Sequence, residues 1–329
     1  MMKASGLSSI YYRFISLMVR LCGSGAAVER ISNAVSALRG AVSSSRNQLY
    51  NSHLKRVFPE RDEIWRNKVL SGYWRVHERN LFALFYLKNK VYRDLKHYIS
   101  WTGREHLDNA IAEGKGVLLL VPHFGDERTL HVLLGMEGYP VDVITSRYSD
   151  MPRYARECRL SIGEKWNNLH FPDENPRWMY RTLQAGRIVH YASTAYGGPG
   201  GSWIANFGVP VLVPSAPWKL WKRTGCRVIL ASCEQTPDMG FSLRFTPVDP
   251  PEDQTGFAET IGMETEKLAR EFPSQYEWKN LLIRHRETNT ISRLGRVPAV
   301  ERELEQLAEY GDADPSRVLP LEGILDSLS

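Results

Sequence analysis

Several features that would narrow the class of this protein are scarce or missing. No apolar run approaches the roughly 18 residues of a membrane-spanning helix, because Arg13 and Arg20 interrupt the apolar, aromatic stretch of residues 10–22. An arginine inside that stretch also argues against a secretory signal peptide. No dense run of Lys and Arg stands out, so we expect no nucleic-acid partner. The few cysteines show no paired metal-binding spacing and are expected to be reduced, buried thiols; they are Cys22, Cys158, Cys226 and Cys233.

Internal repeats and low-complexity tracts are missing too, and what is present is typical of a globular protein. The chain has 329 residues, of which 43% are hydrophobic and 24% charged, enough for a large core. Its net charge of +5 is unevenly spread: residues 300–329 hold eight acids and two arginines, so this tail is −6 and the rest is +11. A basic body suits an anionic membrane surface, a phosphorylated substrate or an acidic carrier protein.

One stretch organises the rest of the chain. Residues 117–121 are five consecutive aliphatics between turn residues, which predicts a strand buried on both faces. Leucines at helical spacing follow up to Gly138, and residues 141–145 read as the next strand. His123 follows the first strand, with Asp126 and Glu127 close behind it. Since ligands bind beyond the carboxyl ends of strands in open parallel sheets, we expect the chemistry at His123.

The remaining pattern alternates strands with helices. Residues 30–98 are predicted to be helical with a break at 58–61, and Asp62 is a candidate cap for the second part. Further helices are expected over 105–113, 152–162, 176–184, 216–223 and 255–272, and further strands over 188–192, 228–233 and 241–248. This order predicts an α/β fold, a mostly parallel central sheet flanked by helices, with a helical N-terminal layer. We divide the chain into an amphipathic segment (1–29), an α/β domain (30–286) and a polar, acidic tail (287–329).

The order of short motifs resembles the lauroyl/myristoyl acyltransferases of lipid A biosynthesis, within the lysophospholipid acyltransferase superfamily. The resemblance covers about residues 30–286. It is carried by the sequences HLKRVFPE (53–60), GKGV (114–117), HFG (123–125), NFGVP (206–210), RTG (223–225) and EFPSQYEW (271–278). It implies a glycerolipid-acyltransferase-like fold and transfer of a fatty acyl group from acyl-carrier protein or acyl-CoA. The acceptor would be a hydroxyl or amine of a lipid or glycolipid, with no cofactor and no metal. It also implies a peripheral protein on the cytoplasmic face of the bacterial inner membrane, with a cytoplasmic protein as the alternative. The N-terminal apolar stretch and the basic body favour binding to an anionic lipid surface.

The catalytic motif of that family is His, four residues, then an acid, and this chain departs from it. Position 128 is arginine, whereas Asp126 and Glu127 lie two positions and one position early. We take His123 as general base, because an imidazole with a pKa of about 6.5 suits that role. Glu127 is expected to replace the missing acid and Asp126 mainly to cap the helix.

Four further residues are candidates for binding substrate. Arg147 and Arg159 match family arginines and could hold phosphate or sugar groups, although structural salt bridges are equally compatible with the sequence. Ser193 and Thr194 stand where the family usually carries Asp-Gln. Backbone N–H groups of residues 125–127, at a helix start, are expected to stabilise the oxyanion.

Two other classes of function are compatible with the sequence. His123, Glu127 and His131 recur every four residues and would share a helix face, as in a metal-dependent hydrolase. The altered acid positions also allow a catalytically degenerate relative that binds lipids or partners.

Overall fold

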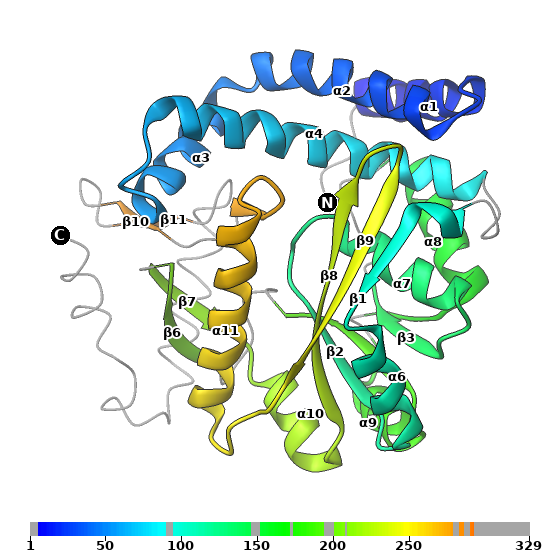
Figure 1. Cartoon of the computed structure of the whole chain (residues 1–329), viewed down its shortest axis with the longest axis vertical. Coiled ribbons are helices and arrows are strands. Elements are labelled where there is room, and N and C mark those ends of the chain that lie inside the picture. Colours follow the sequence, from blue (N-terminus) through cyan, green and yellow to red (C-terminus); the bar gives the residue numbers. More distant parts are fainter. Residues whose placement is uncertain are drawn as a thin grey trace.

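Four helices form the N-terminal part of the chain, and the first two lie along the outer side of the fourth, α4, the longest helix in the described residues (Figure 1). The structure is a computed structural model that describes residues 6–89, 95–145, 152–171, 174–193, 201–207, 209–278, 283–285 and 290–292. The helices are α1 (Gly6–Leu21), α2 (Gly25–Val42), α3 (Ser44–Val57) and α4 (Glu63–Lys88). Asp62 caps α4 as predicted, since its carboxylate accepts the Trp65 N–H at 2.7 Å. The boundary that we expected between residues 29 and 30 lies inside α2.

The centre of the molecule is a seven-stranded sheet of order β1-β9-β8-β2-β5-β3-β4. Strands β8, β2, β5, β3 and β4 run parallel, whereas β9 is antiparallel to β8 and β1 is parallel to β9. Their bounds are β1 Ile99–Thr102, β2 Val117–Val121, β3 Val141–Ile144, β4 Asn168–His170, β5 Ile188–Ala192, β8 Arg227–Thr236 and β9 Gly240–Val248. The predicted α/β fold with a mostly parallel sheet and a helical N-terminal layer is confirmed.

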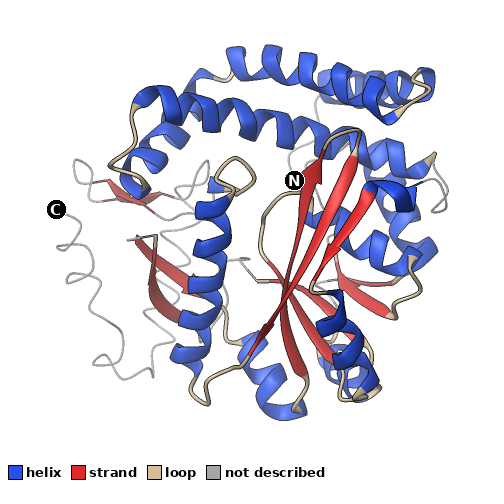
Figure 2. Ribbon diagram, viewed as in Figure 1, coloured by secondary structure: helices blue, strands red, loops and turns tan. Residues whose placement is uncertain are grey.

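Helices cover both faces of this sheet (Figure 2). One face packs against α6 (Arg104–Ala112), α7 (Glu127–Met136), α8 (Arg153–Trp166) and α4, and the other against α9 (Arg177–Gln184), α10 (Ala216–Thr224) and α11 (Gln254–Glu271). Strand β2 serves both layers: Leu119 and its neighbours two residues away point to the first, while Leu118 and Leu120 point to the second. All five β2 side chains are buried, as the aliphatic run predicted.

Several short elements escaped the sequence pattern. The structure adds β1, β4, a hairpin of β6 (Ser202–Asn206) and β7 (Val209–Val213), a 3₁₀ turn (Lys96–Tyr98), and the paired strands β10 (Ile283–His285) and β11 (Thr290–Ser292). The acidic tail from residue 293 lies outside the described residues. Within the described residues, every helix is too short or too polar to span a membrane.

Candidate active site

His123 follows β2 on a tight loop that neighbouring segments hold in place. Gly125 donates its N–H to the carbonyl of Gln275, and Asp126 donates its N–H to the carbonyl of Cys233 on β8, each at 2.8 Å. Gly125 has φ of 59°, and a Cβ at this residue would lie 2.1 Å from the Cys233 oxygen. A side chain is therefore excluded at position 125 by both conformation and space. This close contact fixes the loop that carries the histidine at the carboxyl edge of the sheet.

His123 and Glu127 form a pair at this edge. Nδ1 of His123 lies 3.5 Å from Oε1 of Glu127, and Nε of Arg128 lies 3.4 Å from the same oxygen. Burial alone would raise the pKa of Glu127, but contact with His123 and the charge of Arg128 outweigh burial and hold that pKa at about 2. Glu127 is thus ionised at neutral pH and can stabilise an imidazolium. Glu127, which we predicted to replace the acid missing at position 128, is therefore close enough to His123 for that role.

Asp126 does not act as the side-chain cap that the sequence suggested. It occupies the N-cap position of α7, but its carboxylate accepts no backbone N–H of the first turn. The side chain is buried, and Oδ2 has no hydrogen-bond partner among the described residues. Burial, followed by the negative charge of Glu127, raises the pKa of Asp126 to about 7, against the opposing Thr129 hydrogen bond and the charges of Arg128 and Arg79. The capping prediction was wrong because the fold buries this carboxyl beside another.

The expected backbone oxyanion hole is also corrected by the structure. The N–H groups of Gly125 and Asp126 already donate to the carbonyls of Gln275 and Cys233. The backbone of Glu127 makes a hydrogen bond that helps to lower the pKa of its own carboxyl. Donors that are engaged within the fold are not directed at a reacting carbonyl.

Two cavities meet beside the His123–Glu127 pair. A polar one of about 500 Å³ contains the pair and is lined by Tyr73, Val76, His77, Asn80, Leu81, His123, Phe124, Gly125, Glu127, Arg128, Gln275 and Glu277. A more apolar one of about 480 Å³ lies between α4, α7 and α8, lined by Asn80, Leu81, Leu84, Leu87, Asp126, Arg128, Thr129, His131, Val132, Arg159 and Ile162. Three residues, Asn80, Leu81 and Arg128, line both cavities.

The wall beside His123 is formed by residues that the sequence pattern did not single out. Glu277 accepts the hydroxyls of Tyr50 and Tyr73 at 2.9 and 2.8 Å, and its N–H donates to the carbonyl of His123 at 3.1 Å. The ring of His77 stacks on that of Tyr73, with centroids 5.9 Å apart. These groups are brought from α3, α4 and the segment after α11. Their only sequence signal was the position of Glu277 inside one of the family-like motifs.

The four predicted substrate-binding residues are placed differently. Arg159, on α8, lines the apolar cavity, and burial lowers its pKa to about 10, so it still carries a charge at neutral pH. Ser193 follows β5, where its N–H donates to the Val121 carbonyl at 2.9 Å and its side chain is buried. Arg147 and Thr194 lie outside the described residues. Their roles stay predictions.

The three residues of the hypothetical metal motif do not share a helix face. His123 precedes α7, so only Glu127 and His131 are helical. His131 turns toward the interior, where its Nδ1 lies 3.2 Å from Asn167 and its ring meets His190 edge-on at 5.5 Å. Burial lowers the pKa of both histidines, that of His190 to about 4. In the described part of the chain, no three His, Cys, Asp or Glu side chains are arranged to hold a metal ion.

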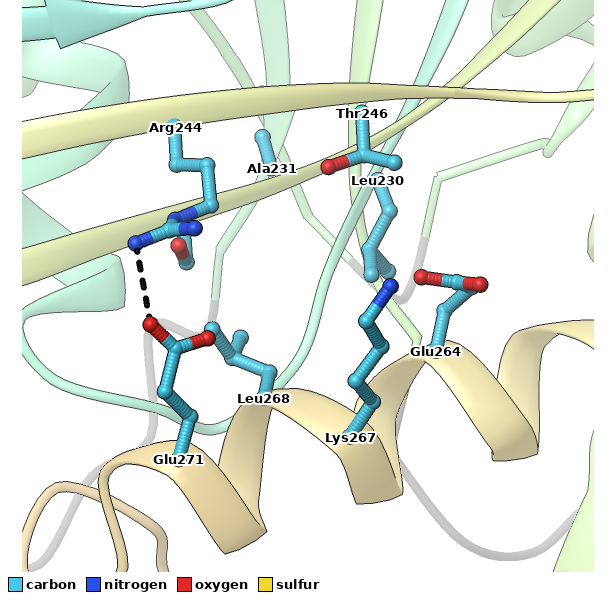
Figure 3. A pocket seen from close by; sticks show the side chains of 9 residues that line it. Leu230, Ala231, Arg244, Thr246, Glu264, Lys267, Leu268 and Glu271 are labelled. Carbon is cyan, nitrogen blue, oxygen red and sulfur yellow. Dashed lines mark ion pairs between the residues drawn. The ribbon is translucent and has the colours of Figure 1, made fainter.

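A further cavity, of about 430 Å³, lies on the opposite face of the sheet, between α11 and strands β8 and β9 (Figure 3). Arg244 lies 3.6 Å from Glu271 and 3.5 Å from the buried Glu234, while Lys267 and Glu264 project from α11 into the same space. Its charges are thus of both signs and partly paired. None of its lining residues comes from the loop that carries His123. The two cavities beside His123 are therefore the candidate site.

Comparison with known proteins gives one result. Residues 6–284 match the family model described as bacterial lipid A biosynthesis acyltransferase. The match covers most of the 329 residues and includes α1 and the loop of His123. No curated protein gives a significant match.

Proposed function

The chain belongs to the bacterial lipid A biosynthesis acyltransferase family, and on this premise we propose that it transfers a fatty acyl group from a thioester to a lipid. The donor would be acyl-carrier protein or acyl-CoA, and the acceptor a hydroxyl or amine of a lipid or glycolipid. The observation that carries the proposal is the His123–Glu127 pair at the carboxyl edge of the sheet, 3.5 Å apart.

The proposed reaction uses His123 as general base. Nε2 of His123 takes the proton of the acceptor hydroxyl, and the acceptor oxygen attacks the thioester carbonyl carbon. Glu127, facing Nδ1, stabilises the imidazolium that forms. The tetrahedral intermediate then collapses: the C–S bond breaks, the imidazolium returns its proton to the leaving thiolate, and an ester and a free thiol result. No covalent enzyme intermediate is needed.

The two adjoining cavities suit the two substrates. The apolar cavity offers Leu84, Leu87, Val132 and Ile162 to a hydrocarbon chain, whose burial is favoured by about 0.8 kcal/mol per CH₂ group. The polar cavity, which contains His123 and Glu277, offers hydrogen-bonding groups to a lipid head. The reacting carbonyl would lie where the two cavities meet.

Acyl transfer by the purified full-length protein tests the function. We expect product with at least one donor from a panel of acyl-CoA and acyl-carrier-protein thioesters, detected by mass spectrometry of the lipid acceptor. His123→Ala should reduce the rate by roughly 10²–10⁴-fold, the usual cost of losing a general base. Glu127→Gln should reduce it less, with little loss of stability. His106→Ala is a matched control, because His106 is exposed on α6.

Three outcomes would contradict the proposal. An active His123→Ala would remove its catalytic basis, and a fully active Glu127→Gln would remove the role of the displaced acid. Lipid binding without turnover of any donor would favour the catalytically degenerate relative.

We also infer that the outer face of α1 binds a membrane surface. Its inner face packs into the core through Ile15 and Val19. The outer face carries a stripe of exposed apolar side chains, with these exposed fractions: Ile10 66%, Phe14 41%, Leu17 52% and Leu21 70%. Arg13 and Arg20 on the same helix and the basic body suit an anionic lipid surface.

Co-sedimentation with vesicles that contain anionic phospholipid tests this location. The double variant Phe14→Ser, Leu17→Ser should lose most vesicle binding. Met263→Ser is the control, since Met263 is 64% exposed on α11, far along the chain from α1. Equal binding of the wild type and both variants would refute the inference.

A further inference from the structure

The acyl-transfer step needs a donor other than the N–H groups of Gly125 and Asp126. When the acceptor oxygen bonds to the carbonyl carbon, the carbonyl oxygen becomes an oxyanion, and donors aimed at it are worth about 2.7–4 kcal/mol each. The N–H groups of Gly125 and Asp126 are engaged with Gln275 and Cys233, both at 2.8 Å. A side chain at the junction of the two cavities is therefore the candidate donor.

Arg128 is the cation at that junction. It lines both the apolar and the polar cavity, and its side chain is 56% exposed, so a substrate can reach it. The other two shared residues are Leu81, which has no polar side-chain group, and Asn80. The amide of Asn80 is already committed: its Nδ2 donates to the Gly125 carbonyl at 2.8 Å, and its Oδ1 accepts from Gln235.

The charges around Arg128 keep it protonated and oriented. Nε of Arg128 lies 3.4 Å from the Glu127 carboxylate. The negative charge of Glu127 raises the pKa of Arg128 above its usual value, with smaller contributions from Asp126 and Glu277. A guanidinium has five N–H donors in a planar fork, so the contact through Nε leaves the two terminal nitrogens to bind an anion. Glu127 therefore orients both His123 and Arg128.

We infer that Arg128 stabilises the oxyanion by donating hydrogen bonds to the thioester carbonyl oxygen. This inference rests on the proposed acyl transfer. As the acceptor O–C bond forms, the carbonyl π electrons move to the oxygen, and the Arg128 N–H groups bind the resulting negative charge. When the C–S bond breaks, the carbonyl is restored and the thiolate leaves with the proton from His123. Arg128 keeps its own protons throughout.

The inference explains why an arginine can stand where related enzymes carry an acid. Successive residues on a helix are about 100° apart. At the start of α7, Glu127 faces His123 and Arg128 faces the junction of the cavities. Moving the acid one position earlier thus leaves position 128 to a residue with another role.

Steady-state kinetics on position 128 test the assignment, using the full-length protein and the donor that gives turnover. Arg128→Gln should lower kcat by roughly 10²–10³-fold with little change in KM, the cost of losing one oxyanion donor. Arg128→Lys should keep part of the activity, because an ammonium supplies charge without the planar fork. Arg128→Glu, which restores an acid at this position, should be the least active. Arg153→Gln is the matched control, since Arg153 is 84% exposed and pairs with Glu157 at 2.6 Å on α8.

Other outcomes would overturn the assignment. Wild-type kcat in Arg128→Gln, or an Arg128→Glu variant more active than the wild type, would do so. So would a loss that appears only in KM, or a large loss of kcat in Arg159→Gln with none in Arg128→Gln. If the wild type turns over and these results follow, only the role of Arg128 falls. If the wild type turns over no donor, the proposed function itself fails and this inference with it.

Discussion

Replacing Asp126 by asparagine should stabilise the protein, and the gain should grow with pH. In the folded state the pKa of Asp126 is about 7, raised from 3.8 by burial and by Glu127. Because the folded state holds its proton more tightly than the unfolded state, stability falls as pH rises between these two values and is lowest above pH 7. At 1.36 kcal/mol per pKa unit, the raised pKa costs the fold about 2 kcal/mol at pH 5, where only the unfolded state is largely ionised, and about 4 kcal/mol above pH 8, where both states are ionised. Asparagine resembles the protonated acid and avoids this cost.

The neighbouring titrations do not obscure the effect. The pKa of Glu127 is held at about 2, so its contribution to stability is constant between pH 5 and 8.5. Burial lowers the pKa of His190 to about 4, which makes the fold less stable as pH falls below about 6.5. That loss is common to the wild type and the variant, so it cancels in their difference.

Urea unfolding of the two proteins at pH 5 and pH 8.5 measures the gain. Asp62→Asn is the matched control, because Asp62 does cap a helix through its side chain at 2.7 Å. Asparagine caps about as well as aspartate, so this control should change stability by no more than about 0.5 kcal/mol. If Asp126→Asn destabilises the protein equally at both pH values, the carboxylate makes a favourable hydrogen bond and the argument from burial is wrong.

Two further predictions concern packing. Gly125→Ala should unfold or inactivate the protein, because its Cβ would lie 2.1 Å from the Cys233 carbonyl oxygen. Gly114 also has a positive φ (70°) but open space around it, so Gly114→Ala should cost only about 1–2 kcal/mol of backbone strain in thermal unfolding. Equal losses of stability in the two variants would show that backbone strain alone matters. Glu78→Gln should lower the free energy of unfolding by about 2–3 kcal/mol and Tyr11→Phe by about 1 kcal/mol, because the buried Glu78 carboxylate accepts hydrogen bonds from both Arg39 and Tyr11. A loss of stability in Tyr11→Phe as large as that in Glu78→Gln would contradict this ordering.

Local patterns predicted the main elements because their causes are local. Five aliphatics between Gly116 and Pro122 cannot leave either face of a strand in water, and β2 is buried on both. Asp62 at the start of α4 and Gly225 at the end of α10 mark those boundaries through their own backbone geometry. Strands β1 and β4 have only four and three residues, too few for a periodicity, and exist because neighbouring strands pair with them.

Within the site, the sequence reached only what lies close along the chain. His123 and Glu127 are four residues apart at a strand–helix junction, so their pairing could be predicted from the expected elements. The wall formed by Tyr73 and Glu277 could not be predicted, because these residues are 204 residues apart in the sequence and meet through a hydrogen bond of 2.8 Å. Nothing in the periodicity of α4 distinguishes a residue that faces this cavity from one that faces the core.

By itself, the sequence determined the α/β class, the strand before His123 and the position of an acid at Glu127, one residue before the position at which the family carries it. These features depend on residue type and spacing alone. Only the tertiary structure decided the burial, the pKa and the hydrogen-bond partners of the residues beside that acid. Asp126 is buried beside Glu127, so its pKa rises instead of its side chain capping α7. The N–H groups of Gly125 and Asp126 donate hydrogen bonds to Gln275 and to Cys233 on β8, which are more than a hundred residues away in the sequence. Burial and hydrogen-bond partners are properties of the assembled fold, and they decide which groups are left to act on a substrate.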